Sequence, residues 1–277
     1  MTKIERLAED VYVFTSELYA QVTAAAVISA DGSVLIDTLA YPSETIEIRD
    51  FVENHLGSPV RYVINTHFHA DHTYGTFLLP KATVVAHSLC RDLLDTLGRS
   101  ALAQAQRSSS DLKGIKVVLP DVVIDDGGLN LHLGGKTLTL SHSPGHSPDL
   151  VTVFLKEDRI LFGSDTVMAV PFVADGNLEH LIQSLEVMLD MELENIVQGH
   201  GDVILRGEIK ARIKLYIKYL KNIRSAVTRA VKSRYTKNSL RKIDLEKYGL
   251  ERILLAGLAE ELHWRNMSLL YDQLKTE

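Results

Sequence analysis

The chain has a single cysteine, Cys90, among its 277 residues, so it cannot form an intramolecular disulfide. It also lacks any apolar run near the roughly 18 residues that a membrane-spanning helix requires. Its first ten residues lack the apolar core of a signal peptide. These absences predict a cytoplasmic protein with no membrane partner. With 45% hydrophobic and 24% charged residues, the composition is that of a globular protein with a sizeable core.

The formal net charge of -6 conceals an uneven distribution along the chain. Residues 206–242 hold 13 of the 30 Lys and Arg residues but only one acid, Glu208, which leaves 17 cations against 35 acids elsewhere. From Glu208 onward, apolar residues recur every three or four positions, which predicts a helix and then a second helix from about Glu251. The basic residues therefore predict a solvated helix face, with a nucleic-acid-binding surface as the alternative.

Short apolar runs, typical of β-strands, alternate with amphipathic segments in the first 205 residues. A hairpin is predicted over residues 24–38, with its turn at Asp31 and Gly32. Further strands are predicted at 11–16, 60–66, 82–88, 116–120, 129–135, 136–143, 150–157, 159–165 and 194–200. Helices are predicted over 43–56, from Leu89 onward and over 178–190, and the polar residues 98–114 are predicted as a mobile insertion or lid. The mixture predicts an α/β (α+β) protein with two sheets and outer helices.

Three histidines and an aspartate are crowded into residues 65–75, which read NTHFHADHTYG, after the strand predicted at 60–66. Neutral imidazole and carboxylate are good ligands for zinc and other first-row metals. On an extended segment His67 and His69 project to the same side, and a turn can direct Asp71 and His72 to a second point. Four ligands exceed what one tetrahedral zinc with an open position needs, so the loop predicts a pair of metals.

With this cluster of residues the sequence resembles the metallo-β-lactamase-fold hydrolases, and the resemblance covers roughly residues 10–205. The family signature His-x-His-x-Asp-His is matched at residues 67–72, and later motifs follow in family order: SPGHSPD, LFGSDT and QGHGD, which supply His146, Asp165 and His200. The resemblance implies an αββα sandwich at residues 1–205, with an added C-terminal helical extension packed on it at 206–277. One departure is the serine, Ser164, between the glycine and the aspartate of the LFGSDT motif.

The same resemblance implies a ligand set for two divalent metal ions, most simply zinc, with iron or manganese as alternatives. His67, His69 and His146 would hold one metal. Asp71, His72 and His200 would hold the other, and Asp165 would bridge them. All seven ligands are nitrogen or oxygen donors, which suits this pair of ions.

The expected chemistry is hydrolysis by a metal-activated water, since the resemblance implies two metal ions and the sequence shows no competing serine or cysteine nucleophile pattern and no glycine-rich phosphate loop. Metal coordination lowers the pKa of water to about 7, so a metal-bound hydroxide would attack an ester, lactone, thioester or related bond of a small molecule. Asp71 is the predicted catalytic residue that orients the hydroxide and moves its proton. By resemblance, an aspartate at the bridging position is unlike the β-lactam-hydrolysing branches.

Four residues are candidates for the substrate pocket. Tyr19 lies at a predicted hairpin tip, Tyr74 directly follows the loop that carries His67, His69, Asp71 and His72 (the metal loop), and Met168 and Phe172 follow Asp165. For each of them, packing within the fold is the alternative. The resemblance also implies that Asp37 lies beneath the metal loop and can orient a ligand. Asp149 stands where relatives often carry glycine.

Two other activities are consistent with the same residues. One is an oxidoreductase of the mononuclear iron persulfide dioxygenase type, and the other is a metallo-nuclease that binds nucleic acid through the basic segment 206–242. The favoured partner is a small-molecule substrate rather than nucleic acid, because the acidic catalytic part would repel a polyanion. A homodimer is left open.

Overall fold

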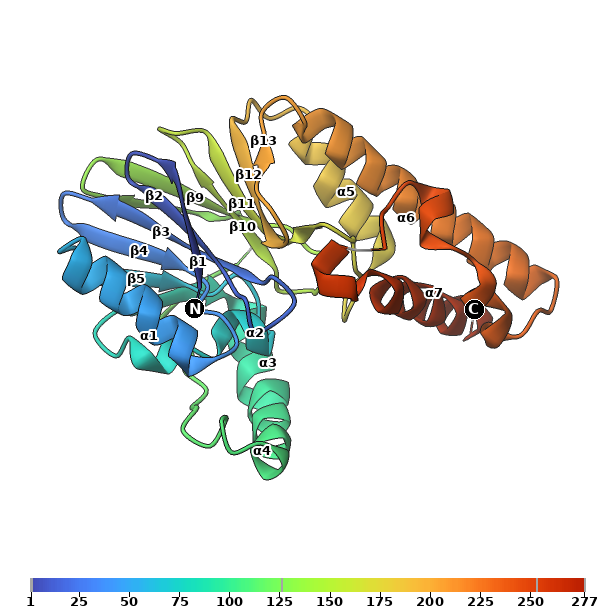
Figure 1. Ribbon diagram of the computed structural model, residues 1–277, viewed down its shortest axis with the longest axis horizontal. Helices are drawn as coiled ribbons and strands as arrows, with labels where there is room; N and C mark the ends of the chain where they lie inside the picture. Colours follow the sequence, from blue (N-terminus) through green and yellow to red (C-terminus); the bar gives the residue numbers. More distant parts are fainter. Residues whose placement is uncertain (1, 126, 253, 277) are drawn as a thin grey trace.

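Two mixed β-sheets face one another in the computed structural model, which describes residues 2–125, 127–252 and 254–276 (Figure 1). Strands follow the chain order across the first sheet: β1 and β2 pair antiparallel, as do β2–β3 and β3–β4, and β4 to β7 run parallel. Its strands are β1 (Lys3–Ala8), β2 (Val11–Thr15), β3 (Thr23–Ser29), β4 (Gly32–Ile36), β5 (Val60–Ile64), β6 (Thr83–His87) and β7 (Val122–Ile124).

The second sheet has the order β13-β12-β11-β10-β9-β8. It is antiparallel except for β11 and β12, which run parallel to each other. Its strands are β8 (Leu129–Leu133), β9 (Lys136–His142), β10 (Val151–Leu155), β11 (Ile160–Met168), β12 (Asn195–His200) and β13 (Ile204–Leu205). An isolated bridge between Val22 and His200 joins the two sheets at the ends that carry the predicted metal residues.

Three hydrophobic clusters explain the layering. The first lies between the sheets and includes Val27 and Ile64 from one sheet and Leu140 and Val153 from the other. The second covers the outer face of the first sheet beneath α1 (Pro42–Asp50), which continues as one π-helical turn (Phe51–His55). The third covers the outer face of the second sheet beneath α5 (Leu178–Met188) and the C-terminal helices. The predicted αββα sandwich is therefore confirmed.

The C-terminal residues form α6 (Ile209–Lys232) and α7 (Ala259–Thr276), joined by short 3₁₀ turns. Ile213, Leu220, Ile223 and Val227 recur on one face of α6 and are fully buried, as the apolar spacing predicts for a helix. In Figure 1 these helices lie on the side of the molecule opposite α1. They share the third cluster with α5, so the 206–277 segment packs against the second sheet through α5.

Several local features differ from the prediction. Residues 98–114, predicted as a mobile insertion or lid, contain the helix α4 (Arg99–Ser108), which continues α3 (Ser88–Leu93) through one π-helical turn. Leu102 is its only buried side chain among the described residues, so the sequence carries too little apolar periodicity to reveal it. Residues 116–120, which were predicted as a strand, form none in the described structure, because strand pairing with β6 begins only at Val122.

The second C-terminal helix begins at Ala259 rather than near Glu251. A 3₁₀ turn over Leu254–Gly257 precedes it. Gly257 has a positive φ of 90°, a backbone conformation that interrupts a helix, so α7 starts only after it. The sequence reading also missed β1 and the two-residue β13, whose pairing partners depend on the fold.

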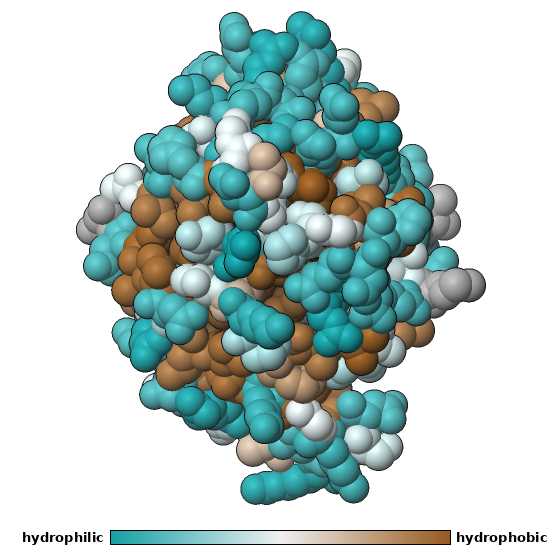
Figure 2. Space-filling model, turned by 90° about the vertical axis from the view of Figure 1, so that its left-hand side faces the viewer, coloured by the Kyte–Doolittle hydropathy of each residue, from teal (hydrophilic) through white to brown (hydrophobic). Residues whose placement is uncertain are grey.

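No helix in the described part of the chain is long and apolar enough to cross a membrane. On the side that lies at the left in Figure 1, hydrophobic residues appear between hydrophilic ones over much of the surface (Figure 2).

Candidate metal centre

The metal loop follows the carboxyl end of β5 and is anchored at three points of its backbone. The Thr66 N–H donates to Asp37 Oδ1 (2.8 Å), and the Phe68 N–H donates to Asp149 Oδ2 (2.7 Å). The Thr38 N–H in turn donates to the His72 carbonyl (2.9 Å). Between the last two anchors the chain turns into the short helix α2 (Ala70–Thr73). This turn separates the directions of the two halves of the loop.

One group of ligand atoms gathers around the first half of the loop. His67 Nε2 lies 2.9 Å from His69 Nδ1, and His146 Nε2 lies 3.0 Å from the same atom. Asp165 Oδ2 completes the group, 3.1 Å from His146 Nε2. All these ligand atoms lie within 4.8 Å of one another, which is the spacing of groups around a single ion.

A second group consists of Asp71, His72 and His200. His200 Nε2 lies 3.3 Å from Asp71 Oδ2, and His72 Nε2 lies 3.9 Å from that oxygen. Asp165 reaches this group too, with Oδ1 3.3 Å from His72 Nε2 and Oδ2 3.5 Å from His200 Nε2. The structure thus brings all seven predicted ligand residues together, with Asp165 between the two groups.

In each of the five histidines, an oxygen atom contacts the ring nitrogen that points away from the centre. This contact fixes the ring and leaves the other nitrogen, which points into the centre, free to bind a metal. Such contacts are typical of metal-binding histidines. The pairs are His67 Nδ1 with Thr66 Oγ1 (3.1 Å), His69 Nε2 with Asp175 Oδ2 (2.8 Å), His72 Nδ1 with Asp37 Oδ2 (2.8 Å), His146 Nδ1 with the Phe172 carbonyl (2.8 Å) and His200 Nδ1 with the Ala20 carbonyl (3.0 Å). The predicted position of Asp37 beneath the loop is where the structure places it.

Two buried polar atoms at the centre, His72 Nε2 and Asp165 Oδ1, lie 3.3 Å apart and have no hydrogen bond of good geometry in the described structure. In the metal-free protein only a proton on His72 can link them, at a distance longer than an ordinary N–H···O bond. A cation between them satisfies both, so the residues present fit a metal ion.

Burial and neighbouring charges act in opposite directions on the acids of the centre. Burial would raise the pKa of Asp165, but His200, His72 and His146 outweigh it and hold the pKa well below its usual range. The pKa of Asp71 is lowered in the same way, against burial, by His72 and His200. Both carboxylates are therefore ionised at neutral pH, as ligands must be.

Four histidines of the centre fall into two classes, according to whether their surroundings lower or raise the pKa. Burial and the neighbouring histidines hold the pKa of His67 well below its usual value, and burial chiefly lowers the pKa of His146 to about 4. Burial would also lower the pKa of His200, but Asp165 and Asp71 raise it to about 10. In the same manner Asp165, Asp37 and Asp71 raise the pKa of His72 well above its usual value against burial.

Metal loading is therefore expected to release protons. A raised pKa means that His72 and His200 are protonated in the metal-free protein at pH 7, and a metal needs their lone pairs. Loading at pH 7 should release roughly two protons, and metal affinity should fall as the pH falls, because protons then compete with the metal. Calorimetry in two buffers of different ionisation enthalpy measures the number, and loading without proton release would contradict it.

The sequence model described as the Metallo-beta-lactamase superfamily matches residues 19–200, which contain every residue of both ligand groups. This chain belongs to the metallo-beta-lactamase superfamily. It is 26% identical over 78% of its length to the atrochrysone carboxyl ACP thioesterase of Pseudocercospora fijiensis, and 27% identical over 58% to the human acyl-coenzyme A thioesterase MBLAC2. The matched regions span 59% and 62% of those two relatives.

A solved structure of similar fold is the metallo-beta-lactamase from Pontibacter korlensis, with a TM-score of 0.62. The likeness covers 77% of this chain and 99% of that one, at 22% identity. This supports the superfamily fold. Membership of the superfamily also implies that a centre made of these histidines and aspartates uses divalent metal ions.

A cavity of about 440 Å³ opens above the two ligand groups of this superfamily member. Its floor includes His69, Asp71, His146, Asp165 and His200. Of the four predicted pocket residues, Tyr19, Met168 and Phe172 line the cavity; Tyr74 is not among the lining residues. The sequence analysis did not identify a further part of the lining, which comes from the C-terminal segment: Leu255, Leu258, Glu261, Leu262 and Arg265. The four-residue spacing of Leu258 and Leu262 was the available signal, but it reads equally well as core.

The two departures from the family pattern have local structural roles. Ser164 has a left-handed backbone (φ 43°), and its Oγ lies 2.7 Å from Thr66 Oγ1, the atom that contacts His67. Asp149 is fully buried, and burial raises the pKa of its carboxyl group. Through the Phe68 N–H it holds the metal loop from below.

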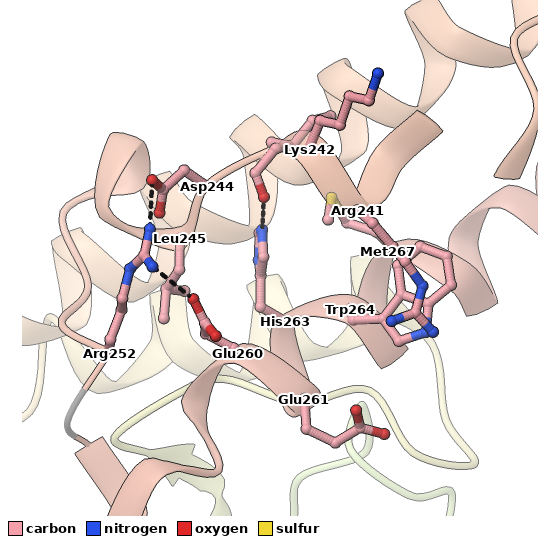
Figure 3. Close-up of a pocket in the computed structure, with 11 residues that line it drawn as sticks. Arg241, Lys242, Asp244, Leu245, Arg252, Glu260, Glu261, His263, Trp264 and Met267 are labelled. Atoms are coloured by element: carbon pink, nitrogen blue, oxygen red, sulfur yellow. Dashed lines mark hydrogen bonds and ion pairs between the residues drawn. The ribbon is translucent and has the colours of Figure 1, made fainter. Parts of the chain in front are cut away.

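A second cavity, of about 380 Å³, lies on another side of α7 and is shown in Figure 3. Its arginines are already engaged: Arg252 pairs with Asp244 (2.6 Å) and Glu260 (3.0 Å), and Arg241 lies over the Trp264 ring at 4.2 Å. Among the described residues, the groups that could hold a metal are both beneath the first cavity. The first cavity is therefore the candidate active site.

Proposed function

We propose that this chain is a hydrolase that holds two divalent metal ions, most simply zinc, one in each ligand group with Asp165 between them. The observation that carries the proposal is the position of both groups at the floor of one 440 Å³ cavity. All seven residues offer nitrogen or oxygen, and none offers a thiolate, which suits zinc and other first-row divalent ions. When bound, these ions supply Lewis acidity and activate water for attack.

The chain's own residues complete the chemistry around such a site. The Asp71 carboxylate lines the cavity and is ionised, so it can accept a hydrogen bond from an attacking water and orient that water during the proton transfer. Burial and the nearby Asp71 raise the pKa of Tyr19, so its phenol stays protonated at the cavity wall. The Tyr19 hydroxyl can then donate a hydrogen bond to a substrate oxygen.

The walls above the metals favour an ester or thioester with an apolar acyl group. Met168 and Phe172 line the cavity together with Leu255, Leu258 and Leu262 of the C-terminal segment. Arg265 is the single Lys or Arg among the described lining residues. The relatives named as an acyl carrier protein thioesterase and an acyl-coenzyme A thioesterase support the thioester. An uncharged acyl chain would be buried between these walls.

A substrate panel on metal-analysed protein tests the proposal. We expect about two divalent ions per chain and turnover of acyl thioesters or esters in preference to lactones, phosphodiesters and β-lactams. Full turnover with no divalent ion bound would contradict it. The iron dioxygenase alternative is separated in the same assay by measuring iron content and oxygen uptake with a thiol persulfide.

The metallo-nuclease alternative depends on the basic segment 206–242. On α6, Lys221 and Arg224 pair with Glu186 (3.0 Å) and Glu179 (2.5 Å) of α5, and these pairs lie outside the candidate cavity. RNA binding at low salt that disappears when Lys210, Lys214 and Lys218 are neutralised would favour the nuclease.

Leu262 should set the length of the acyl group. Leu262→Phe adds bulk to the cavity wall, so kcat/KM should fall about tenfold or more for the longest accepted acyl chain and change little for acetyl substrates. Leu97→Phe is the matched control, because Leu97 is 55% exposed and lies outside the cavity lining. An equal loss for all chain lengths would show that Leu262 does not contact the acyl group.

A further inference from the structure

Asn266 on α7 is a buried polar residue that the metal chemistry above does not use. Its side chain is 0% exposed. Its Nδ2 donates to the Pro171 carbonyl (2.7 Å), and its Oδ1 accepts from the Val173 N–H (2.9 Å). The amide thus clips the backbone on both sides of Phe172. The orientation of the amide is determined, because a carbonyl needs a donor and an N–H needs an acceptor.

The clipped segment follows β11 and directly contacts a metal ligand. The carbonyl of Phe172 accepts the His146 Nδ1–H (2.8 Å), which leaves His146 Nε2 facing Asp165 and His69. The Phe172 side chain also lines the candidate cavity. The orientation of one peptide carbonyl therefore sets both the tautomer of His146 and a wall of the pocket.

Behind Asn266, a directed chain of buried hydrogen bonds ties α7 to α6 and to the following turn. The second Nδ2 hydrogen of Asn266 points to Tyr219 Oη (3.2 Å), and the Tyr219 hydroxyl lies 3.0 Å from His263 Nδ1. The His263 Nε2–H donates to the Ile243 carbonyl (3.2 Å), the dashed contact of His263 in Figure 3. Since His263 donates through Nε2, its Nδ1 accepts from Tyr219, and every donor in the chain has an acceptor.

We propose that Asn266 is a positioning residue for the metal centre: it fixes the Phe172 carbonyl and so holds His146 with Nε2 free for a metal. Asn266 lies outside the matched region 19–200, so the C-terminal extension supplies a determinant of the metal site as well as a cavity wall. The role rests on the proposed metal function only in its last step. The tautomer of His146 can be measured without any metal.

The test compares Asn266→Ala with Tyr219→Phe. Asn266→Ala removes the clip on residues 171 and 173. Tyr219→Phe removes a buried hydroxyl from the same hydrogen-bond chain but leaves both contacts to the segment in place. A purely structural role predicts similar effects of the two changes on the centre. A positioning role predicts an effect of Asn266→Ala alone.

In metal-free protein, nitrogen NMR should show His146 as the Nδ1–H tautomer in the wild type and in Tyr219→Phe, and as a mixture of tautomers in Asn266→Ala. The Val173 amide hydrogen should exchange with solvent at least tenfold faster in Asn266→Ala only. In chelator competition, the affinity for one of the two ions should fall roughly 10- to 100-fold, with the other ion little affected.

Unchanged tautomer and unchanged affinity for both ions in Asn266→Ala would overturn the proposal, as would equal losses in Tyr219→Phe. If Asn266→Ala does not fold, Asn266→Leu serves instead: leucine is close to asparagine in size and fills the same space, but it can neither donate to the Pro171 carbonyl nor accept from the Val173 N–H, and the same loss of one ion is expected. If the wild type binds no divalent ion, the proposed function is wrong, and the NMR readouts still decide the role of Asn266.

Discussion

Asp165→Ala is expected to abolish hydrolysis and to remove most of the bound metal. The Asp165 carboxylate lies 3.1 Å from His146 Nε2 and 3.3 Å from His72 Nε2, so among the described residues of the two ligand groups it is the one that reaches both. It is 3% exposed, and water cannot readily take its place. Without its charge, Asp71 is the one carboxylate left among the seven proposed ligand residues to balance the ions. We expect kcat/KM to fall roughly 10³-fold or more, equivalent to at least about 4 kcal/mol of transition-state stabilisation.

The measurement pairs metal analysis with kinetics on the best substrate of the panel. Asp202→Ala is the matched control, because the Asp202 side chain is 87% exposed and lies two residues after His200. This control should keep wild-type metal content and activity, since exposed ion pairs contribute little. Wild-type turnover by Asp165→Ala would sink the two-metal proposal. Loss of one ion with activity retained would reduce it to a single-metal site.

The residues of the two candidate ligand groups could be picked out from the sequence because their spacing is local or lies in short recognisable motifs. His67 to His72 fall within one loop, and His146, Asp165 and His200 come from the connection after β9, from within β11 and from the end of β12. The position of Asp37 followed from the family resemblance, and the structure gives its physical reason: β4 and β5 are parallel neighbours that end together. The apolar alternation of the strands likewise indicated two sheets.

The pocket and the outer contacts of the ligands could not be predicted in this way. Leu258, Leu262 and Asn266 lie beyond the family-matched region 19–200, far along the chain from the metal loop, and apolar spacing in this segment is equally typical of core packing. The carbonyls of Ala20 and Phe172 hold two histidines, yet a backbone oxygen has no signature in a sequence. Such contacts depend on the packing of distant elements rather than on local pattern.

Gly199→Ala should destabilise the protein and disrupt the second ligand group. A Cβ on Gly199 would lie 1.9 Å from Asp165 Oδ1 and 2.8 Å from the Asp165 backbone nitrogen. Such overlap with backbone cannot be relieved by rotating a side chain, so β12 and β11 would have to move apart. Overpacking of this kind costs about 1–3 kcal/mol. Because Gly199 directly precedes His200, the shift should also displace the His200 ring from Asp71.

Two measurements separate these effects. Chemical denaturation of metal-free Gly199→Ala should show the loss of unfolding free energy, and chelator competition should show weaker binding of at least one ion. Gly207→Ala is the control, since a Cβ there meets no atom within 4 Å and should leave both quantities unchanged. Because the expected effect comes from a steric contact inside the centre, a Gly199→Ala variant with wild-type stability and both ions bound would mean that Asp165 does not occupy this position. In that event the bridging role of Asp165 would have to be abandoned as well, because the contact with Gly199 and the contacts with His72 and His146 fix the same carboxylate.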